Sequence, residues 1–210
     1  MTMKTKIIFA TGNAGKMREI REILADMDME VLSMKEAGVE ADIVEDGTTF
    51  EENAIIKAQA VAHMLAEHSG ERQNSAIVLA DDSGLEIDAL NKEPGIYSAR
   101  YLGEDTPYSV KSANLIERLA GVPDEDRTAR FVCAIAAVMP NGETVTTQGV
   151  IEGRIGYEEK GNNGFGYDPI FCVPEYGRTT AQLTEDEKNR ISHRGKALEA
   201  MKDELKKRMP

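Results

Sequence analysis

The chain has 210 residues, of which 41% are hydrophobic and 30% are charged, and its formal net charge is −12 at pH 7. This balance is typical of a soluble globular protein that forms one large domain or two small lobes. The acidic excess argues against binding to long nucleic acid, which requires a basic surface, but a few local cations can still bind a nucleotide.

No apolar run reaches the length of a membrane span, and the start of the chain lacks the apolar core of a signal peptide. Both cysteines, Cys133 and Cys172, lie in apolar, strand-like stretches. We therefore expect reduced core thiols in a cytoplasmic protein that does not bind membranes.

The first predicted elements are a strand at residues 6–10 and a helix from residue 17, joined by the sequence TGNAGK. Glycines let the backbone approach a phosphate, and the helix start offers free N–H groups beside the charge of Lys16. The sequence is not a P-loop, because the glycine spacing is too short and Met17 replaces the Ser or Thr that holds magnesium. An ordinary strand-to-helix turn explains the same residues equally well.

A short strand at residues 29–33 and an acidic loop at residues 35–47 come next. Thr49 and Glu52 have the spacing of a capping box, which predicts a helix from Thr49 toward residue 69. Glu45 and Asp46 precede this helix and offer hard oxygen ligands, which suit Mg²⁺ or Mn²⁺. A solvated loop is the alternative for both residues.

The sequence AIVLADDSGL predicts a buried strand at residues 76–80 that delivers Asp81 and Asp82 to its carboxyl end. Adjacent carboxylates at that place are costly unless a cation or hydrogen-bond donors compensate them. A divalent metal with a phosphate ligand would do so. The alternative is a turn between two strands, because Asp, Ser and Gly are all turn formers.

The next predicted elements are a strand at residues 85–89 and a helix that begins at Pro107 and has its last apolar residue at 119. Two strands follow, at residues 128–138 and 144–151, and Asn141-Gly142 between them predicts a hairpin turn. A glycine-rich stretch at residues 160–166 and a strand at 170–173 follow. The order of these elements predicts a mixed α/β sheet in two lobes.

Two further segments carry candidate binding groups. The small residues around Phe165 and Tyr167 leave room for a flat ligand to stack on an aromatic face, unless these rings fold back into the core. The second segment, residues 188–194, places three cations beside an interruption in a helix that Thr184 and Glu187 open with a capping box. A solvated basic helix face is the alternative there.

The segments TGNAGK, TFEENAIIKA, ADDSGL, PGIYSARY, GFGYDPIF and EDEKNRISHRGKAL occur in this order between Thr11 and Leu198. Together they resemble the family of noncanonical purine NTP pyrophosphatases, also called inosine or xanthosine triphosphate pyrophosphatases. The resemblance implies an α/β fold with an elongated mixed sheet flanked by helices, in which residues 1–210 form a single domain of two lobes with the active cleft between them. It also implies a homodimer and Mg²⁺-dependent cleavage between the α- and β-phosphates.

The resemblance assigns roles residue by residue. Asp82 matches the family's proton acceptor and a metal ligand, and Glu45 matches a second metal-binding carboxylate. The matched substrate-binding positions are Thr11, Gly12, Asn13, Ala14, Gly15, Lys16, Ser83, Phe165, Gly166, Tyr167, Asp168, Lys188, His193 and Arg194. We expect Lys16, with Lys57 and Lys188, to neutralise the leaving pyrophosphate.

The predicted function is hydrolysis of the purine nucleoside triphosphates ITP, dITP and XTP, which removes deaminated purines from the nucleotide pool. A related pyrophosphatase for methylated or pyrimidine nucleotides is one alternative. A nucleotide sensor without catalysis is another, and the presence of Asp82 and Glu45 argues against it.

Overall fold

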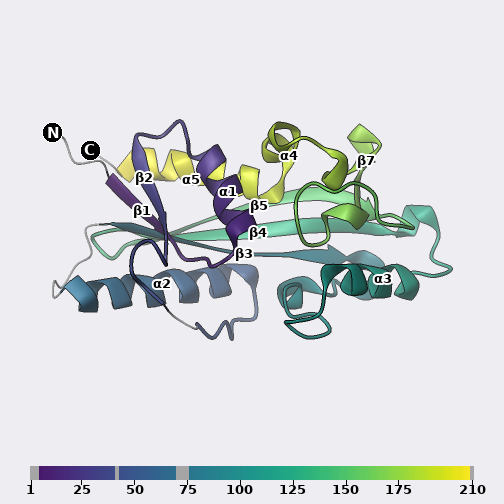
Figure 1. The fold of residues 1–210 in the computed structure, drawn as a ribbon, viewed down its shortest axis with the longest axis horizontal. Helices are drawn as coiled ribbons and strands as arrows, with labels where there is room; N and C mark the ends of the chain where they lie inside the picture. Colours follow the sequence, from purple (N-terminus) through teal and green to yellow (C-terminus); the bar gives the residue numbers. More distant parts are fainter. Residues whose placement is uncertain (1–4, 41–42, 70–75, 209–210) are drawn as a thin grey trace. The chain divides into compact units, whose positions relative to one another are not determined.

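The computed structural model describes residues 5–40, 43–69 and 76–208. Within these ranges, seven strands form one mixed sheet in the order β2-β1-β3-β4-β5-β6-β7 (Figure 1). The strands are β1 (Thr5–Phe9), β2 (Met29–Ser33), β3 (Ile77–Ile87), β4 (Thr128–Val138), β5 (Thr144–Ile155), β6 (Phe171–Val173) and β7 (Arg178–Thr179). The α-helices are α1 (Ala14–Ile23), α2 (Phe50–Ser69), α3 (Tyr108–Arg118), α4 (Glu185–Ile191) and α5 (His193–Arg208). The expected α/β class is confirmed.

Strand pairing explains why the sheet is mixed. Strand β1 pairs in parallel with both β2 and β3, as expected of strands joined by helical crossovers. Strand β6 pairs antiparallel with β5, after the long segment of residues 156–170, and with β7, after a short connection.

The chain divides into two compact units. Unit 1 consists of Met1–Asp82, Cys133–Gln148 and Lys196–Pro210, and unit 2 consists of Ser83–Val132 and Gly149–Gly195. Strands β3, β4 and β5 each contribute residues to both units.

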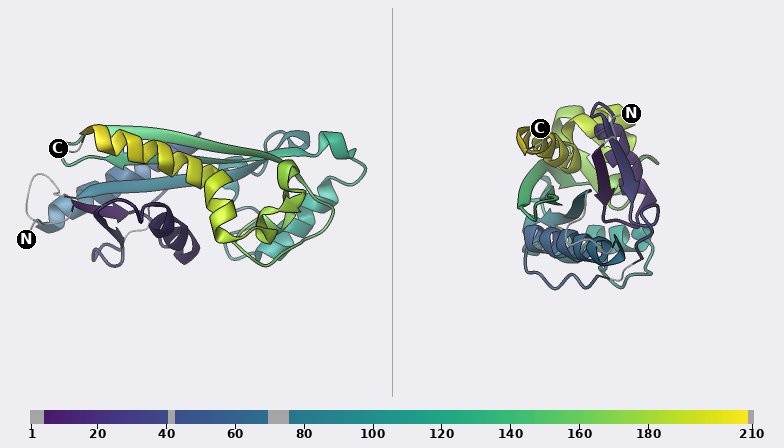
Figure 2. Two further views of the ribbon diagram at one scale, coloured as in Figure 1. Left: turned by 90° about the horizontal axis from the view of Figure 1, so that it is seen from above. Right: turned by 90° about the vertical axis from the view of Figure 1, so that its left-hand side faces the viewer.

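The core of unit 1 lies between strands and helices. Helices α1 and α5 lie on one side of the strands and α2 on the other (Figures 1 and 2). Ile20 of α1 and Leu198 of α5 are fully buried against β1, β3 and β4 in one apolar cluster. On α2 the small residues Ala54, Ala58 and Val61 are fully buried, so this helix has a narrow apolar stripe.

Unit 2 has its own apolar core. Leu115 and Leu119 at the end of α3 join Ile155 and the ring pair Phe131–Phe171, whose centroids lie 4.5 Å apart.

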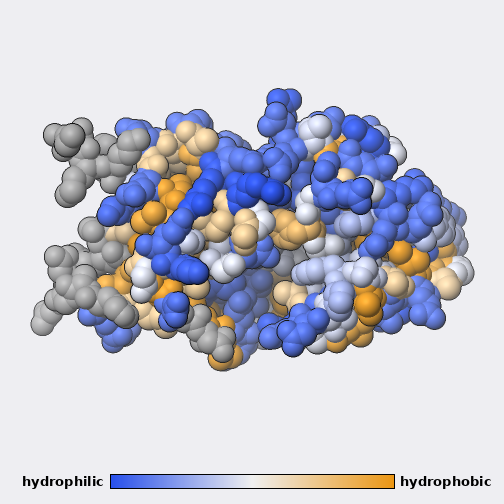
Figure 3. All heavy atoms as spheres, in the orientation of Figure 1, coloured by the Kyte–Doolittle hydropathy of each residue, from blue (hydrophilic) through white to orange (hydrophobic). Residues whose placement is uncertain are grey.

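The exposed face in Figure 3 carries mostly hydrophilic residues, in keeping with the charged composition. Among the described helices, none has the length and hydropathy needed to cross a membrane.

The structure corrects one expectation about the central carboxylates. Residues 81–84 form no turn between two strands, because β3 runs without interruption through Asp81, Asp82, Ser83 and Gly84. The continuation of β3 in the sheet past the end of β1 outweighs the local turn preference of these residues.

Other elements differ in detail from the prediction. Thr49 accepts the N–H of Glu52 at 3.1 Å, but the Glu52 carboxylate accepts from Thr48 instead of closing a capping box. The Thr184–Glu187 capping box forms as predicted, and the interruption that follows is the single residue Ser192. Strand β7 was not predicted, and the polar stretch 71–75 lies outside the described residues. Both cysteines are free thiols, as expected.

Candidate active site

Asp81 and Asp82 lie inside β3, just past the end of its neighbour β1. The last parallel pair joins Phe9 to Leu79, and the Ala10 N–H still reaches the Leu79 carbonyl at 2.7 Å. The two carboxylates therefore lie at the carboxyl end of β1, where ligands bind in α/β sheets. Asp81 is fully buried and Asp82 is 8% exposed.

The Asp82 carboxylate is held by α2 in an environment that disfavours its charge. Asn53 donates to Asp82 Oδ2 at 3.0 Å from a fully buried position on α2. Burial is the main cause that raises the pKa of Asp82, and the nearby charge of Glu45 acts in the same direction. Lys57 and Lys16 favour the ionised form but do not outweigh burial. A further cation at this carboxylate would therefore stabilise its charge.

Two lysines surround the pair of carboxylates. Lys16 contacts both oxygens of Asp81, at 3.1 and 3.0 Å. Lys57 donates to the backbone carbonyl of Asp81 at 3.0 Å and contacts Glu45 Oε1 at 2.9 Å. Both side chains are mostly buried, with exposed fractions of 18% for Lys16 and 13% for Lys57. Water therefore screens the electrostatic interactions of these two charges less than it would at the surface.

The glycine-containing turn before α1 has the geometry of a helix start. Asn13 is the N-cap of α1, and its side chain accepts the N–H of Lys16 at 3.0 Å. The Asn13 N–H in turn donates to Thr11 Oγ1 at 3.1 Å. The first turn of α1, which carries Lys16, is thus also the positive end of the helix dipole.

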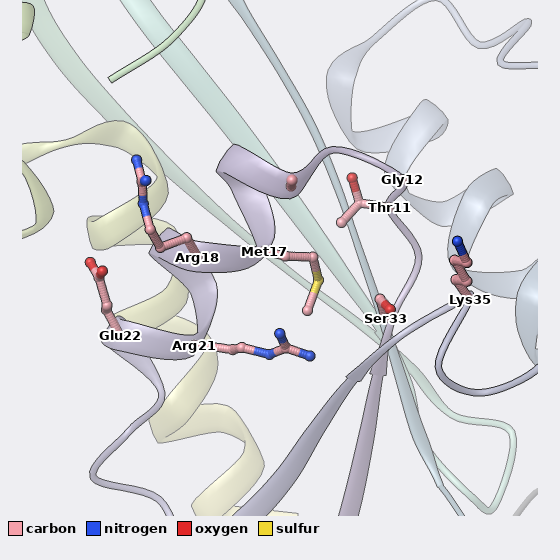
Figure 4. Close-up of a pocket in the computed structure, with 9 residues that line it drawn as sticks. Thr11, Gly12, Met17, Arg18, Arg21, Glu22, Ser33 and Lys35 are labelled. Carbon is pink, nitrogen blue, oxygen red and sulfur yellow. The ribbon is translucent and has the colours of Figure 1, made fainter. Parts of the chain in front are cut away.

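A hollow of about 490 Å³ lies on another side of this turn (Figure 4). Its walls are Thr11, Gly12, Ala14, Met17, Arg18, Arg21, Glu22, Ser33 and Lys35. In Figure 4 the side chains of Met17 and Arg21 project from α1 toward Ser33, at the end of β2. Arg21 donates to the Val31 carbonyl and pairs with Glu36 at 2.5 Å, so much of its charge is already neutralised. Lys16 is also paired, with Asp81, but it lies in the first turn of α1 beside the buried carboxylates, which makes it the candidate for holding an anion there.

Metal binding in unit 1 rests on few donors. Glu45 and Asp82 supply carboxylate oxygens, which suit Mg²⁺ better than zinc. No group of three or more His, Cys, Asp or Glu side chains that could hold a metal occurs in the part of the chain that the structure describes. Any ion held here would keep several water ligands, as Mg²⁺ usually does.

Unit 2 brings together the other predicted site residues. Arg194 donates to Ser83 Oγ at 3.1 Å, and its guanidinium carbon lies 5.5 Å from the centre of the Phe165 ring. The Lys188 ammonium lies 5.0 Å from the same ring. Cations from α4 and from the start of α5 therefore lie over the Phe165 ring, and Arg194 links that ring to Ser83 of β3.

Asp168 fixes the loop that carries Phe165. One of its oxygens accepts the Phe165 N–H at 2.8 Å and the Lys188 ammonium at 2.7 Å, and the other accepts the Thr180 hydroxyl at 2.8 Å. Gly164 is required for this arrangement, because it has a φ of +73° and a Cβ there would lie 2.1 Å from the carboxylate. Asp168 is 3% exposed and Lys188 is 6% exposed.

Tyr167 and His193 are also buried. The Tyr167 hydroxyl donates to the Ser98 carbonyl at 2.8 Å, and only 3% of the residue is exposed. The His193 ring stacks on Phe131 with centroids 4.8 Å apart, and 7% of the residue is exposed. Their roles as substrate contacts remain predictions.

The structure reveals residues that the sequence analysis did not assign. Asn53 holds Asp82, and Thr180 holds Asp168. For Asn53 a signal existed: it lies four residues before Lys57, so two polar side chains share one face of a helix whose neighbours are apolar. No local pattern distinguishes Thr180.

Comparison with known proteins places these geometries in context. A family model described as the Ham1 family matches residues 7–204. A Clostridium perfringens protein named dITP/XTP pyrophosphatase is 50% identical over 201 residues, covering 96% of this chain and 97% of that protein. A Bacillus subtilis protein of the same name is 46% identical, with coverage of 96% and 97%.

Solved structures agree with this match. The Ham1 protein of Staphylococcus aureus superposes with a TM-score of 0.83 at 40% identity, covering 98% of this chain and all of that chain. A Mycobacterium abscessus structure titled as a nucleoside-triphosphatase or dITP/XTP pyrophosphatase gives a TM-score of 0.70 at 40% identity, with coverage of 94% and 98%.

Proposed function

The chain belongs to the Ham1 family, and on that premise we propose that it hydrolyses dITP, ITP and XTP to the nucleoside monophosphate and pyrophosphate. The enzyme is a nucleoside-triphosphate pyrophosphatase, in keeping with its full-length relatives, which are named dITP/XTP pyrophosphatase. The structural observation that carries the proposal is the grouping of buried Asp82 with two ammonium groups beside the helix start that follows β1. We propose that this activity removes deaminated purines from the nucleotide pool of the cytoplasm.

In this proposal the residues of unit 1 act on the triphosphate. Asp82 accepts a proton from the attacking water, and its raised pKa brings it closer to the pH at which a base works well. Lys16, Lys57 and the free N–H groups at the start of α1 stabilise the negative charge that grows on the leaving pyrophosphate.

Mg²⁺ is the cofactor that fits the donors of unit 1. Glu45 and Asp82 would hold the ion, since their carboxylates affect one another and burial disfavours the Asp82 charge. When bound, Mg²⁺ polarises phosphoryl oxygens and neutralises their charge.

The residues of unit 2 recognise the base. We propose that the purine stacks on the Phe165 ring and that His193 and Arg194 donate to the 6-keto oxygen of hypoxanthine or xanthine. Adenine carries an amino group at that position, so its binding would leave the donors unpaired, which can cost orders of magnitude in selectivity. Ser83 and Asp168 shape the surroundings of the ring through Arg194 and Lys188.

We also propose that the enzyme is a homodimer. Unit 2 exposes several large apolar or aromatic side chains, namely Tyr97, Leu102, Tyr108, Val110 and Tyr157. Light scattering coupled to gel filtration tests this, and a mass equal to one chain at micromolar concentration would refute it.

The decisive test of function measures pyrophosphate release from a panel of nucleoside triphosphates with and without Mg²⁺. We expect rapid release from dITP, ITP and XTP, slow release from ATP and GTP, and loss of activity in EDTA. Equal turnover of all purines would overturn the specificity, and preference for methylated or pyrimidine nucleotides would favour a related pyrophosphatase. Binding of dITP without any turnover would indicate a sensor.

A further inference from the structure

Ser98 links two segments of unit 2 that carry proposed substrate contacts. Its hydroxyl accepts the Leu85 N–H at 2.9 Å and donates to the Gly95 carbonyl at 2.6 Å. Its own carbonyl accepts the Tyr167 hydroxyl at 2.8 Å. Leu85 follows Ser83 on β3 by two residues, whereas Tyr167 follows Phe165 by two, so Ser98 ties the Ser83 strand to the Phe165 loop.

The Tyr167 hydroxyl is suited to this bond alone. Its ring is enclosed and meets the Tyr108 ring edge to face, with centroids 5.1 Å apart and planes at 86°. Burial raises the pKa of Tyr167, so the phenol stays protonated and remains a donor at neutral pH. The polar atom of the Tyr167 side chain thus has its hydrogen-bond partner inside the protein.

A second donor holds the adjoining carbonyl. Lys111 is 1% exposed, and its ammonium donates to the Ala99 carbonyl at 2.6 Å. Two consecutive carbonyls, those of Ser98 and Ala99, are therefore fixed by side chains from the 165–168 loop and from α3.

These contacts close into a ring within unit 2. Arg194 joins Ser83 to the face of Phe165, while Ser98 joins the two segments on which those residues lie. In order, the members are Ser83, Arg194, Phe165, Tyr167, Ser98 and Leu85. Removing the Tyr167 hydroxyl opens the ring without touching any group that meets the base.

We infer that Tyr167, through its hydrogen bond to Ser98, is a positioning residue that fixes Phe165 relative to Ser83 and Arg194 and thereby sets base selectivity. The inference rests on the proposed function, since it concerns the site that recognises the base. It differs from the role that the sequence resemblance implies, in which Tyr167 contacts the substrate itself.

The test compares Tyr167→Phe with wild type and with Tyr101→Phe as a matched control. The Tyr101 hydroxyl also makes hydrogen bonds, to Asn114 and from Arg118, but lies outside the ring of contacts. The readout is the ratio of kcat/KM for dITP to kcat/KM for dATP, measured well below the melting temperature. A loss of folded protein lowers both values equally and leaves the ratio unchanged.

We expect Tyr167→Phe to lower this ratio by about tenfold, mostly through dITP, because a misplaced ring and guanidinium weaken contacts that only the correct base makes. Tyr101→Phe should change it by less than about twofold. An unchanged ratio in Tyr167→Phe would overturn the inference. Should that variant fail to fold, Ser98→Ala tests the other half of the ring of contacts: it keeps the carbonyl that accepts from Tyr167 but removes the hydroxyl that accepts the Leu85 N–H. This variant must also lower the ratio, and an unchanged ratio there would overturn the inference. Wild-type protein that does not hydrolyse dITP would refute the proposed function instead.

Discussion

The buried ion pair between Lys188 and Asp168 offers a sharp test of how unit 2 is held together. The ammonium lies 2.7 Å from the carboxylate, and the two side chains are only 7% and 4% exposed. Asp168 also accepts from the Phe165 N–H and the Thr180 hydroxyl. Replacement of Lys188 by Met keeps an unbranched chain of nearly the same length and removes the ammonium group with its charge and donors.

The magnitude follows from the burial of the pair. Removing one partner of a buried ion pair costs about 3–5 kcal/mol, because the other charge remains desolvated. Two neutral donors still serve the Asp168 carboxylate in Lys188→Met, so we expect the lower end, about 3 kcal/mol. In a protein of this size that corresponds to a fall in Tm of roughly 6–12 °C.

Circular dichroism during heating measures this change. The control is Arg178→Met, since Arg178 pairs with Glu187 at 3.0 Å in the same unit but with side chains 41% and 33% exposed. Surface pairs contribute up to about 1 kcal/mol, so the control should lose a few degrees at most. Equal losses in Tm for Lys188→Met and Arg178→Met would refute the reasoning. The double variant Asp168→Asn/Lys188→Met should recover part of the loss, because it removes both charges.

Three further substitutions test other parts of the molecule. Asp82→Asn should lower turnover of dITP by more than about 10³-fold while nucleotide binding persists, and near-normal turnover would remove Asp82 from its role. Because burial raises the pKa of Asp82, the wild type should lose stability relative to Asp82→Asn as the pH rises through that pKa, so in metal-free buffer at neutral pH the variant should melt no lower than wild type. Phe165→Ala should raise KM for dITP at least tenfold with a smaller change in kcat, since stacking contributes about 1–3 kcal/mol per base, and an unchanged KM would count against stacking. Arg127→Met removes the donors to three backbone carbonyls from a side chain that is 1% exposed, so urea unfolding should show a loss of about 3 kcal/mol or more, and a loss below 1 kcal/mol would contradict this account.

Local pattern predicted much of the fold. The bounds of β2 and β4 agree with the predicted strands, and the Thr184 capping box marks the start of α4. Each of these signals is contained within a few residues, in the alternation of apolar side chains or in the spacing of a cap. Local signals of that kind do not depend on which strands become neighbours.

Where neighbours decide, the sequence analysis was wrong or incomplete. Asp81 to Gly84 have turn-forming side chains, yet they are extended because β3 continues through them as one strand between β1 and β4 in the sheet order. The two residues of β7 form a strand only through pairing with β6. A strand this short has no pattern of its own to detect.

Motifs identify positions more reliably than they identify what the side chains do. Phe165 and Tyr167 have the same spacing from glycines, but the Tyr167 hydroxyl is used to hold Ser98 whereas Phe165 lies against two cations. A residue proposed to touch the base and a residue that holds another in place therefore lie in the same short motif. Their difference lies in the partner of each polar atom, which only the three-dimensional structure supplies. A selectivity ratio separates the two roles, because removing the Tyr167 hydroxyl alters discrimination without deleting a contact to the base.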